Sequence, residues 1–123
     1  MIHGIGVDIC RISRMQKILD REGLDGPFLR KTFTEQERME SEAQQDKASF
    51  FAGRFAVKEA VFKALHEIRV DLRSIESLHH QDGSPYVNMT EELSLKMKDA
   101  GVQALHLSVS NEADYVIAFV VAE

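Results

Sequence analysis

The sequence predicts an α+β protein in which helices pack against an antiparallel sheet. Residues 105–110 alternate apolar and polar side chains, and residues 115–121 are almost wholly apolar, a pattern that predicts two paired strands. Most of the first 65 residues instead carry apolar side chains at helical spacing. The expected order of elements is a strand, three helices, two strands, a helix and two strands, which favours the α+β class.

The bulk composition is that of one globular domain. The chain has 123 residues, 44% hydrophobic and 28% charged, so residues 1–123 are expected to form a single domain with its own core. One cysteine excludes a disulfide framework. A net charge of −5 argues against general nucleic-acid binding. No apolar run approaches the roughly 20 residues of a membrane helix, and no signal peptide is evident. No membrane partner and a cytoplasmic location are therefore expected.

The N-terminal stretch 2–9 is expected to be a strand. Its β-branched residues favour extended structure, and Gly4 and Gly6 indicate a bend or the close approach of another backbone. Asp8 ends this apolar run, where a carboxylate requires a partner. Two interpretations stay open: Asp8 binds a metal or a cation, or it caps a helix that starts just afterwards.

Residues 11–22 form an amphipathic helix with an unusually basic polar side. Arg14, Lys17 and Arg21 occupy much of that side, in a protein whose net charge is negative. Such a helix could dock an acidic partner, because complementary charge speeds and orients encounter. The alternative is an ordinary solvated face.

The next segment contains a break and a second helix. Residues 23–27 are rich in Gly and Asp and contain Pro27, and 28–33 are short and mixed. Thr34 and Glu37 have the spacing of a capping box, which predicts a helix from 35 to about 43. Residues 44–47 form a polar connection, and Ser49 is a candidate cap for the helix that follows.

Residues 50–65 form the strongest helix of the sequence, and charges intrude into its aromatic pattern. Arg54 and Lys58 make one row of side chains four residues apart, and Glu59 and Lys63 lie in a second row beside it. An ordinary surface helix separates apolar from charged faces more cleanly. This mixture predicts a site for an anion and a metal, with a solvated ladder of ion pairs as the alternative.

The second half of the chain is expected to contain two hairpins and a helix. A weak strand within 71–80, a turn at 81–85 and a strand at 86–89 make the first hairpin. Thr90 caps a helix that ends at Gly101. Residues 111–114 form the turn between the last two strands.

The two carboxylates that interrupt apolar patterns, Asp8 and Glu59, would suit Mg²⁺ if the fold brings them together. Mg²⁺ is commonly held by one or two carboxylates, waters and substrate phosphates. Arg54, Lys58 and Lys63 could then bind phosphate oxygens. Neither a Walker-type loop nor a Gly-x-Ser-x-Gly elbow is present. Further polar contacts to an extended ligand could come from Ser108, Ser110 and the turn 83–85.

Four stretches together resemble the bacterial holo-acyl-carrier-protein synthases, the small 4′-phosphopantetheinyl transferases. The resemblance covers essentially the whole chain, and its most specific part is Phe-Ala-Gly-Arg-Phe-Ala-Val-Lys-Glu-Ala within residues 51–60. The matching stretches are Gly4–Ile9, Phe51–Leu65, Gly83–Pro85 and His106–Ser110.

This resemblance implies a 4′-phosphopantetheinyl transferase-like fold and a reaction. The phosphopantetheine arm of coenzyme A would pass to a serine of apo acyl carrier protein, releasing adenosine 3′,5′-bisphosphate and supporting fatty acid biosynthesis. Asp8 and Glu59 would bind Mg²⁺, and Lys63 would lie near the transferred phosphate. The positions that match residues near the nucleotide and its phosphates are Arg54, Lys58, Gly83, Pro85 and Ser110.

The resemblance also implies partners. The family is typically trimeric with sites at subunit interfaces, and the acidic carrier protein docks on the first helix. In this chain the docking residues would be Arg14, Lys17 and Arg21, on the helix whose basic side is evident from the sequence alone.

Two positions depart from the family pattern. A histidine usually follows the second serine of the last motif, whereas this chain has Asn111, which cannot accept a proton near neutral pH. The serine proton would then go to Glu59 through a bound water or to Lys63, or no strong base is needed. Arg11 replaces a residue that is often acidic. A related Mg²⁺-dependent phosphoryl or nucleotidyl enzyme and a non-catalytic binding module are the competing functions.

Overall fold

The computed structural model describes residues 1–123, which form five helices, a short 3₁₀ turn and five strands. In chain order they are β1 (Gly4–Arg11), α1 (Ile12–Glu22), α2 (Pro27–Thr32), α3 (Glu35–Ser41), α4 (Lys47–Leu65), the 3₁₀ turn η1 (Leu72–Ser74), β2 (Glu76–His79), β3 (Pro85–Asn88), α5 (Glu91–Asp99), β4 (Leu105–Glu112) and β5 (Tyr115–Ala122).

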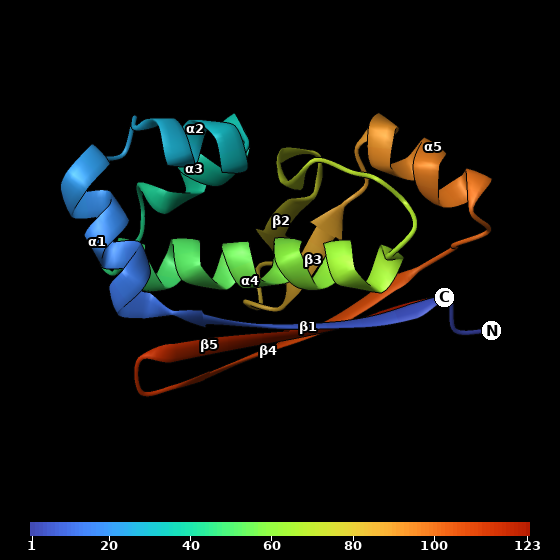
Figure 1. The fold of residues 1–123 in the computed structure, drawn as a ribbon. Coiled ribbons are helices and arrows are strands. Elements are labelled where there is room, and N and C mark those ends of the chain that lie inside the picture. Colours follow the sequence, from blue (N-terminus) through green and yellow to red (C-terminus); the bar gives the residue numbers. More distant parts are fainter.

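The long helix α4 lies between two layers. On one side is a three-stranded antiparallel sheet in the order β1-β5-β4. On the other side are the separate β2–β3 hairpin, helices α1 to α3 near one end of α4, and α5 near the other (Figure 1). A helix covered on several sides needs apolar residues around most of its circumference, which explains why α4 lacks a single apolar stripe.

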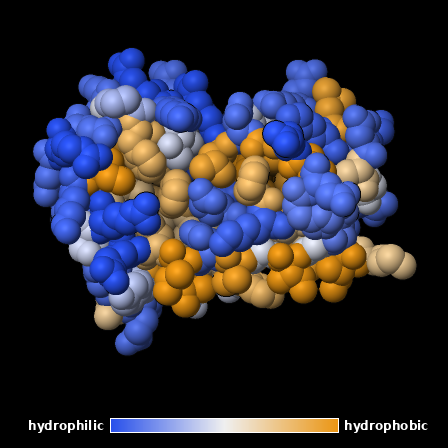
Figure 2. Space-filling model, viewed as in Figure 1, coloured by the Kyte–Doolittle hydropathy of each residue, from blue (hydrophilic) through white to orange (hydrophobic).

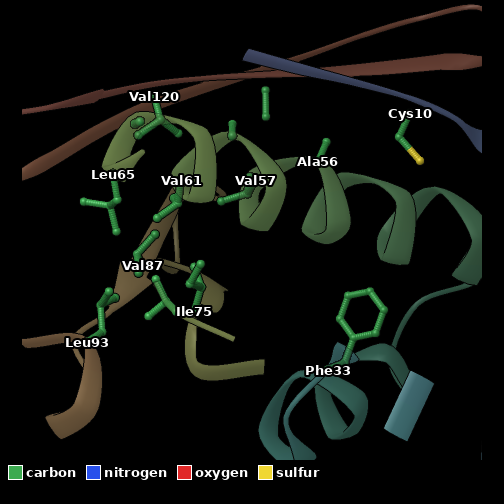
Figure 3. Close-up of a cluster of buried hydrophobic side chains, with 14 of the residues drawn as sticks. Cys10, Phe33, Ala56, Val57, Val61, Leu65, Ile75, Val87, Leu93 and Val120 are labelled. Carbon is green, nitrogen blue, oxygen red and sulfur yellow. The ribbon is translucent and has the colours of Figure 1, made fainter. Parts of the chain in front are cut away.

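The hydrophobic core follows α4 along its length (Figure 3). Val57, Val61 and Leu65 of α4 are almost fully buried. Val120 of β5 contributes to this core from the sheet side, and Ile75, Val87 and Leu93 contribute from the opposite side. The Phe33 ring meets the Phe51 ring of α4 at a centroid distance of 4.9 Å.

Strand β1 approaches the backbone of α4 closely because two of its inward positions are glycines. A Cβ atom on Gly6 would overlap the carbonyl oxygen of Ala60, and one on Gly4 would overlap that of Ala64. The expected close backbone approach at these glycines is therefore confirmed. It aligns the next inward position of the strand, Asp8, with the charged side of α4.

The outer sheet face, which points away from α4, is largely apolar. Strand β5 is the central strand of the sheet, and alternate side chains of β1 and β5 are exposed on this face. Figure 2 shows hydrophobic residues gathered on the side of the molecule where the sheet lies in Figure 1. The exposed apolar residues of this face are Ile5, Val7, Ile9, Tyr115, Ile117 and Phe119.

Most predicted elements are confirmed, and the differences are local. The Thr34–Glu37 capping box and the Thr90 cap are both present, whereas α4 is capped by Asp46 and not by Ser49. Helix α2 was not predicted, because six residues starting at Pro27 are too short to show helical periodicity. No helix of the chain combines the length and the hydrophobicity that crossing a bilayer requires.

The close approach of β1 to α4 makes Gly6 sensitive to substitution. We expect Gly6→Ala to lower the free energy of unfolding by about 1–3 kcal/mol or more, because the new methyl group forces the two backbones apart. Urea denaturation measures the change. Gly53→Ala is the matched control: its Cβ would meet nothing closer than Val116 Cγ1 at 3.9 Å, so a helix-interior alanine should be neutral or stabilising by up to about 1 kcal/mol. Wild-type stability of Gly6→Ala would show that the strand has room to move.

Candidate active site

The fold brings together three of the predicted site residues. Asp8 lies on β1, and Glu59 and Lys63 lie one turn apart on α4. Lys63 Nζ is 3.3 Å from Asp8 Oδ1 and donates to the backbone oxygen of Val7 at 3.0 Å. The Lys63 side chain is 52% exposed and that of Asp8 17%, so the cluster is open to a ligand on one side.

The alternative role of Asp8 as a helix cap is wrong. Helix α1 begins at Ile12 with Arg11 as its N-cap residue, and Asp8 lies inside β1. The cap function belongs to Asp114 of the β4–β5 turn. Its Oδ1 accepts from the Ser13 backbone N–H at 3.0 Å, and its backbone oxygen accepts from Ile12 N–H at 2.7 Å.

The Glu59 carboxyl lies in an environment that disfavours its charged form. Burial raises the pKa of the Glu59 carboxyl most, the Asp8 carboxylate raises it further, and Lys63 opposes both. Both carboxylates supply the hard oxygen donors that Mg²⁺ prefers. No group of three or more His, Cys, Asp or Glu side chains gathers in the chain. A pair of carboxylates fits an ion whose other ligands are waters and phosphate oxygens.

A cavity of about 270 Å³, here called the carboxylate cavity, opens beside this cluster. Arg14 is the only cation among its lining residues, so the cavity borders both the two carboxylates and the basic side of α1. Burial, followed by Asp8, raises the pKa of the Cys10 thiol in its wall. The lining residues are Asp8, Ile9, Cys10, Arg14, Met15, Ile18, Phe28, Phe55 and Glu59.

A larger cavity of about 670 Å³, here called the hairpin cavity, lies between α4 and the β2–β3 hairpin. Three predicted nucleotide-site residues line it: Arg54, Gly83 and Pro85. His79 and Asn111 also line it, so the position that departs from the family pattern faces this cavity. The two cavities share no lining residue.

Arg54 is held firmly in the wall of the hairpin cavity. Its side chain is 3% exposed, and its Nη2 donates to Glu40 Oε1 at 2.7 Å. Its Nη1 contacts the His79 ring, and its guanidinium carbon lies 4.3 Å from the centre of the Phe50 ring. Burial lowers the pKa of Arg54 and also that of His79. The buried Nε of Arg54 has no hydrogen-bond partner.

The prediction that Lys58 contacts ligand phosphates is wrong. The Lys58 side chain is 0% exposed and lines neither cavity. Its Nζ is 2.7 Å from Glu37 Oε1, so the charge that was expected to meet a ligand is neutralised inside the protein. Burial lowers the pKa of Lys58, and Glu37 opposes that effect.

Ser110 and Asn111 lie on opposite faces of β4. Ser110 is exposed on the outer sheet face, together with His106 and Ser108 as the alternation predicted. Asn111 lies on the inner side of the strand and lines the hairpin cavity. The structure therefore does not bring Ser110 to Arg54, Gly83 and Pro85 within one chain.

The predicted docking residues Arg14, Lys17 and Arg21 are all exposed on α1. Arg11 is exposed beside them, and its Nη2 donates to the Tyr115 hydroxyl at 3.0 Å. A recess of about 410 Å³ is lined by Arg11, Arg14, Lys17 and Tyr115, with Ile9 and Ser13.

Sequence reasoning missed Glu40 and His79 as neighbours of Arg54. Glu40 belongs to a helix that was predicted only as acidic, and His79 was expected in an exposed loop. The one usable indication was that a basic residue inside an aromatic-rich helix needs a buried partner. This requirement indicates that the partner is an acceptor or an acid, but it does not indicate where in the sequence the partner lies.

Comparison with known proteins agrees with this fold. Residues 4–120 match the family model of the 4′-phosphopantetheinyl transferase superfamily. The chain belongs to this superfamily and is therefore a transferase.

Individual relatives carry a narrower name. The chain is 40% identical to a holo-[acyl-carrier-protein] synthase of Aromatoleum aromaticum, over 100% of this chain and 98% of that one. The crystal structure of a synthase of the same name from Neisseria meningitidis superposes with a TM-score of 0.90 at 34% identity, covering 100% and 99% of the two chains. A Bacillus anthracis synthase solved in complex with coenzyme A (3′,5′-ADP) gives a TM-score of 0.77 at 32% identity, covering 99% and 96%.

The raised pKa of Glu59 predicts a pH-dependent effect on stability. Since the unfolded chain ionises this carboxyl at a lower pH than the folded one, stability falls as pH rises through the two pKa values. Without divalent cations, Glu59→Gln should raise the Tm at pH 7 and leave it nearly unchanged at about pH 3.5, where both states are protonated. Calorimetry measures both values.

The exposed Glu67 just after α4 supplies the control for this measurement. Glu67→Gln should shift the Tm little at either pH. A Tm of Glu59→Gln that lies at or below the wild-type value at pH 7 would contradict the unfavourable environment assigned to Glu59.

Proposed function

We propose that the chain is a holo-[acyl-carrier-protein] synthase, with residues 1–123 acting as one domain. It transfers the 4′-phosphopantetheine group of coenzyme A to a serine of apo acyl carrier protein and releases adenosine 3′,5′-bisphosphate, supporting fatty acid biosynthesis in the cytoplasm. The observation that carries this proposal is the Asp8–Glu59–Lys63 cluster in a chain matched from end to end by synthases of that name.

Asp8 and Glu59 are the residues that would hold Mg²⁺. The pKa of Glu59 is raised first by burial and then by the Asp8 carboxylate, and a cation between the two carboxylates would offset both effects. When bound, the ion would neutralise negative charge on the pyrophosphate oxygens of coenzyme A. The ammonium of Lys63, 3.3 Å from Asp8, is placed to bind oxygens of the transferred phosphate.

The reaction is a displacement at phosphorus. A bond forms between the serine oxygen of the carrier protein and the phosphorus next to pantetheine, and the bond from that phosphorus to the bridging oxygen breaks. The electron pair of the broken bond leaves with adenosine 3′,5′-bisphosphate. The serine proton would pass to the Glu59 carboxylate, or to Lys63 only in its uncharged form, because an ammonium has no lone pair to accept it. Asn111 cannot accept the proton, because an amide has no basic atom near neutral pH.

The nucleotide end of coenzyme A is proposed to occupy the hairpin cavity. Its volume of about 670 Å³ lies within the range of small-molecule sites. Arg54 supplies a guanidinium in its wall that suits phosphate oxygens, and Gly83 and Pro85 form another part of that wall. The pyrophosphate would extend from that cavity toward a cluster of Asp8, Glu59 and Lys63.

Because one chain separates the two cavities, we propose that a homotrimer forms the complete sites. Contiguous exposed apolar surface of this kind marks a protein interface, and the outer sheet face provides it on β1 and β5. Ser110 lies on this same face, so its proposed contact with the nucleotide would be made in a site shared by two chains.

Disrupting the outer sheet face should dissociate the assembly. Light scattering should give the mass of three chains for the wild type and of fewer for Phe119→Asp, because a carboxylate cannot be buried there without a partner. Transferase activity should fall with the mass. Leu95→Asp is the control, since Leu95 is an equally exposed apolar residue on α5. A trimer that survives Phe119→Asp would place the interface elsewhere.

The proposed activity has a direct assay. Incubation with apo acyl carrier protein, coenzyme A and Mg²⁺ should raise the carrier mass by one phosphopantetheine and release one adenosine 3′,5′-bisphosphate per carrier. Chelation of the metal should abolish transfer. Glu59→Gln should lower turnover by more than the roughly 10–100-fold that loss of an outer-shell metal partner costs. Binding of coenzyme A without any mass gain would indicate a non-catalytic module instead.

The same assay tests the docking surface on α1. The double variant Arg14→Glu/Arg21→Glu should raise the KM for carrier protein about tenfold or more and leave the KM for coenzyme A unchanged, because like charges repel an acidic partner. Lys98→Glu, a single charge reversal on α5, should change neither. Equal effects on both substrates would argue against docking on α1.

A further inference from the structure

The buried ion pair between Glu37 and Lys58 lines neither cavity, yet it ties together the elements around the hairpin cavity. Lys58 lies on α4 and Glu37 on α3, and both side chains are 0% exposed. Isolated charges are very unfavourable in a protein interior, so each must be compensated completely.

Lys58 uses all three of its N–H donors. Besides the Glu37 carboxylate, its Nζ donates to the backbone oxygen of Leu72 at 3.0 Å and to that of Ile75 at 2.5 Å. An ammonium has three donors, so none remains. Lys58 therefore fastens the segment that leads into β2 directly to α4.

Glu37 is compensated from three elements as well. Its Oε1 accepts from the Thr34 backbone N–H at 2.8 Å, within the capping box of α3. Its Oε2 accepts from the Ser77 backbone N–H at 2.9 Å, which fixes β2 at the position that lines the cavity. The Thr34 hydroxyl donates to Glu76 at 2.6 Å and adds a second link between α3 and β2.

These bonds set two walls of the hairpin cavity. Ile75 and Ser77 lie four and two residues before His79, and the same hairpin then supplies Gly83 and Pro85. Glu40 follows Glu37 by about one turn of α3 and accepts the hydrogen bond that holds Arg54. A shift of Glu37 or Glu40 would therefore move groups that line the cavity.

We propose that the Glu37–Lys58 pair positions the hairpin cavity for the nucleotide of coenzyme A. This inference rests on the proposed function of that cavity. Both are positioning residues, because neither side chain reaches a ligand. Net stability does not explain a charged pair here, since well-packed apolar residues of similar volume are often equally stabilising. An apolar side chain cannot, however, donate hydrogen bonds to a carboxylate and two carbonyl oxygens at once.

The experiment separates positioning from stability with two variants. Lys58→Met removes the donors and leaves Glu37 buried without its cation, so both stability and affinity should fall. Lys58→Met/Glu37→Gln removes both charges, so most of the lost Tm should return. The carbonyl oxygens of Leu72 and Ile75 still lack the Nζ donor, and the Kd for coenzyme A should stay raised by about tenfold, the effect of roughly one hydrogen bond.

Calorimetric titration with coenzyme A and with adenosine 3′,5′-bisphosphate measures the affinities. The Kd values of both ligands should rise by the same factor, because the change lies where the shared nucleotide end is proposed to bind. Leu93→Ala, in the core beneath α5, is the control for lost stability without a change in the cavity. It should bind both ligands as the wild type does.

The measured affinities and Tm values together decide the inference. Raised Kd values in the double variant, together with a recovered Tm, support positioning. Wild-type affinity in the double variant, or affinity that follows the Tm in every variant including Leu93→Ala, overturns it. Arg54→Gln tests the cavity itself. If this variant binds both ligands normally, the nucleotide lies elsewhere, and both the proposed nucleotide site and the positioning role of the pair fail. If Arg54→Gln is the only variant that binds them more weakly, only the positioning role is overturned.

Discussion

The contact between β1 and α4 is the constraint on which the rest of the structure depends. Two glycines allow the strand to lie against the helix backbone, and the alternation of the strand then turns Asp8 toward the same helix. Glu59 and Lys63 project to that side of α4 one turn apart. A site assembled from two elements far apart in sequence is thereby set by one backbone-to-backbone distance. Any residue with a Cβ at Gly4 or Gly6 would change that distance.

Helix α4 carries charges for two different purposes. Glu59 and Lys63 face the carboxylate cavity or solvent. Arg54, in the wall of the hairpin cavity, and the buried Lys58 instead meet carboxylates of α3. Arg54 and Glu59, five residues apart, are separated by about 140° around a helix of 3.6 residues per turn. The helix thus divides the molecule into a carboxylate side and a hairpin side, and each cationic or acidic row contributes to only one of them.

Local patterns explain what the sequence could predict. Caps such as Thr34 and Thr90 depend on residues within one turn, and the β4–β5 hairpin depends on neighbouring segments, so both follow from short stretches of sequence. The burial of Lys58 depends on Glu37 from another helix, and no spacing within either helix encodes that meeting. The two charged rows of α4 look equivalent in the sequence because helical periodicity gives relative directions only. Which row faces inward depends on the elements that pack against it.

The site residues divide in the same way. Asp8 and Glu59 could be linked from sequence because each interrupts an apolar pattern and needs a partner. Ser110 and Asn111 are adjacent in sequence, yet β4 sends them to opposite faces of the sheet. Resemblance to a family aligns positions along the chain, but a contact made by a neighbouring chain cannot be distinguished from one made within the same chain.

The strand order β1-β5-β4 has a consequence for how the protein forms. The first strand pairs only with the last one, so the sheet that supports Asp8 cannot exist before residues 115–122 have been synthesised. The cap of α1 comes from Asp114, close to that same strand. A nascent chain that lacks these residues therefore has neither an ordered Asp8 nor a capped basic helix. Such long-range pairing must overcome the entropy of closing a large loop. It also means that the basic side of α1, which would meet a partner protein, is ordered only when the sheet is complete.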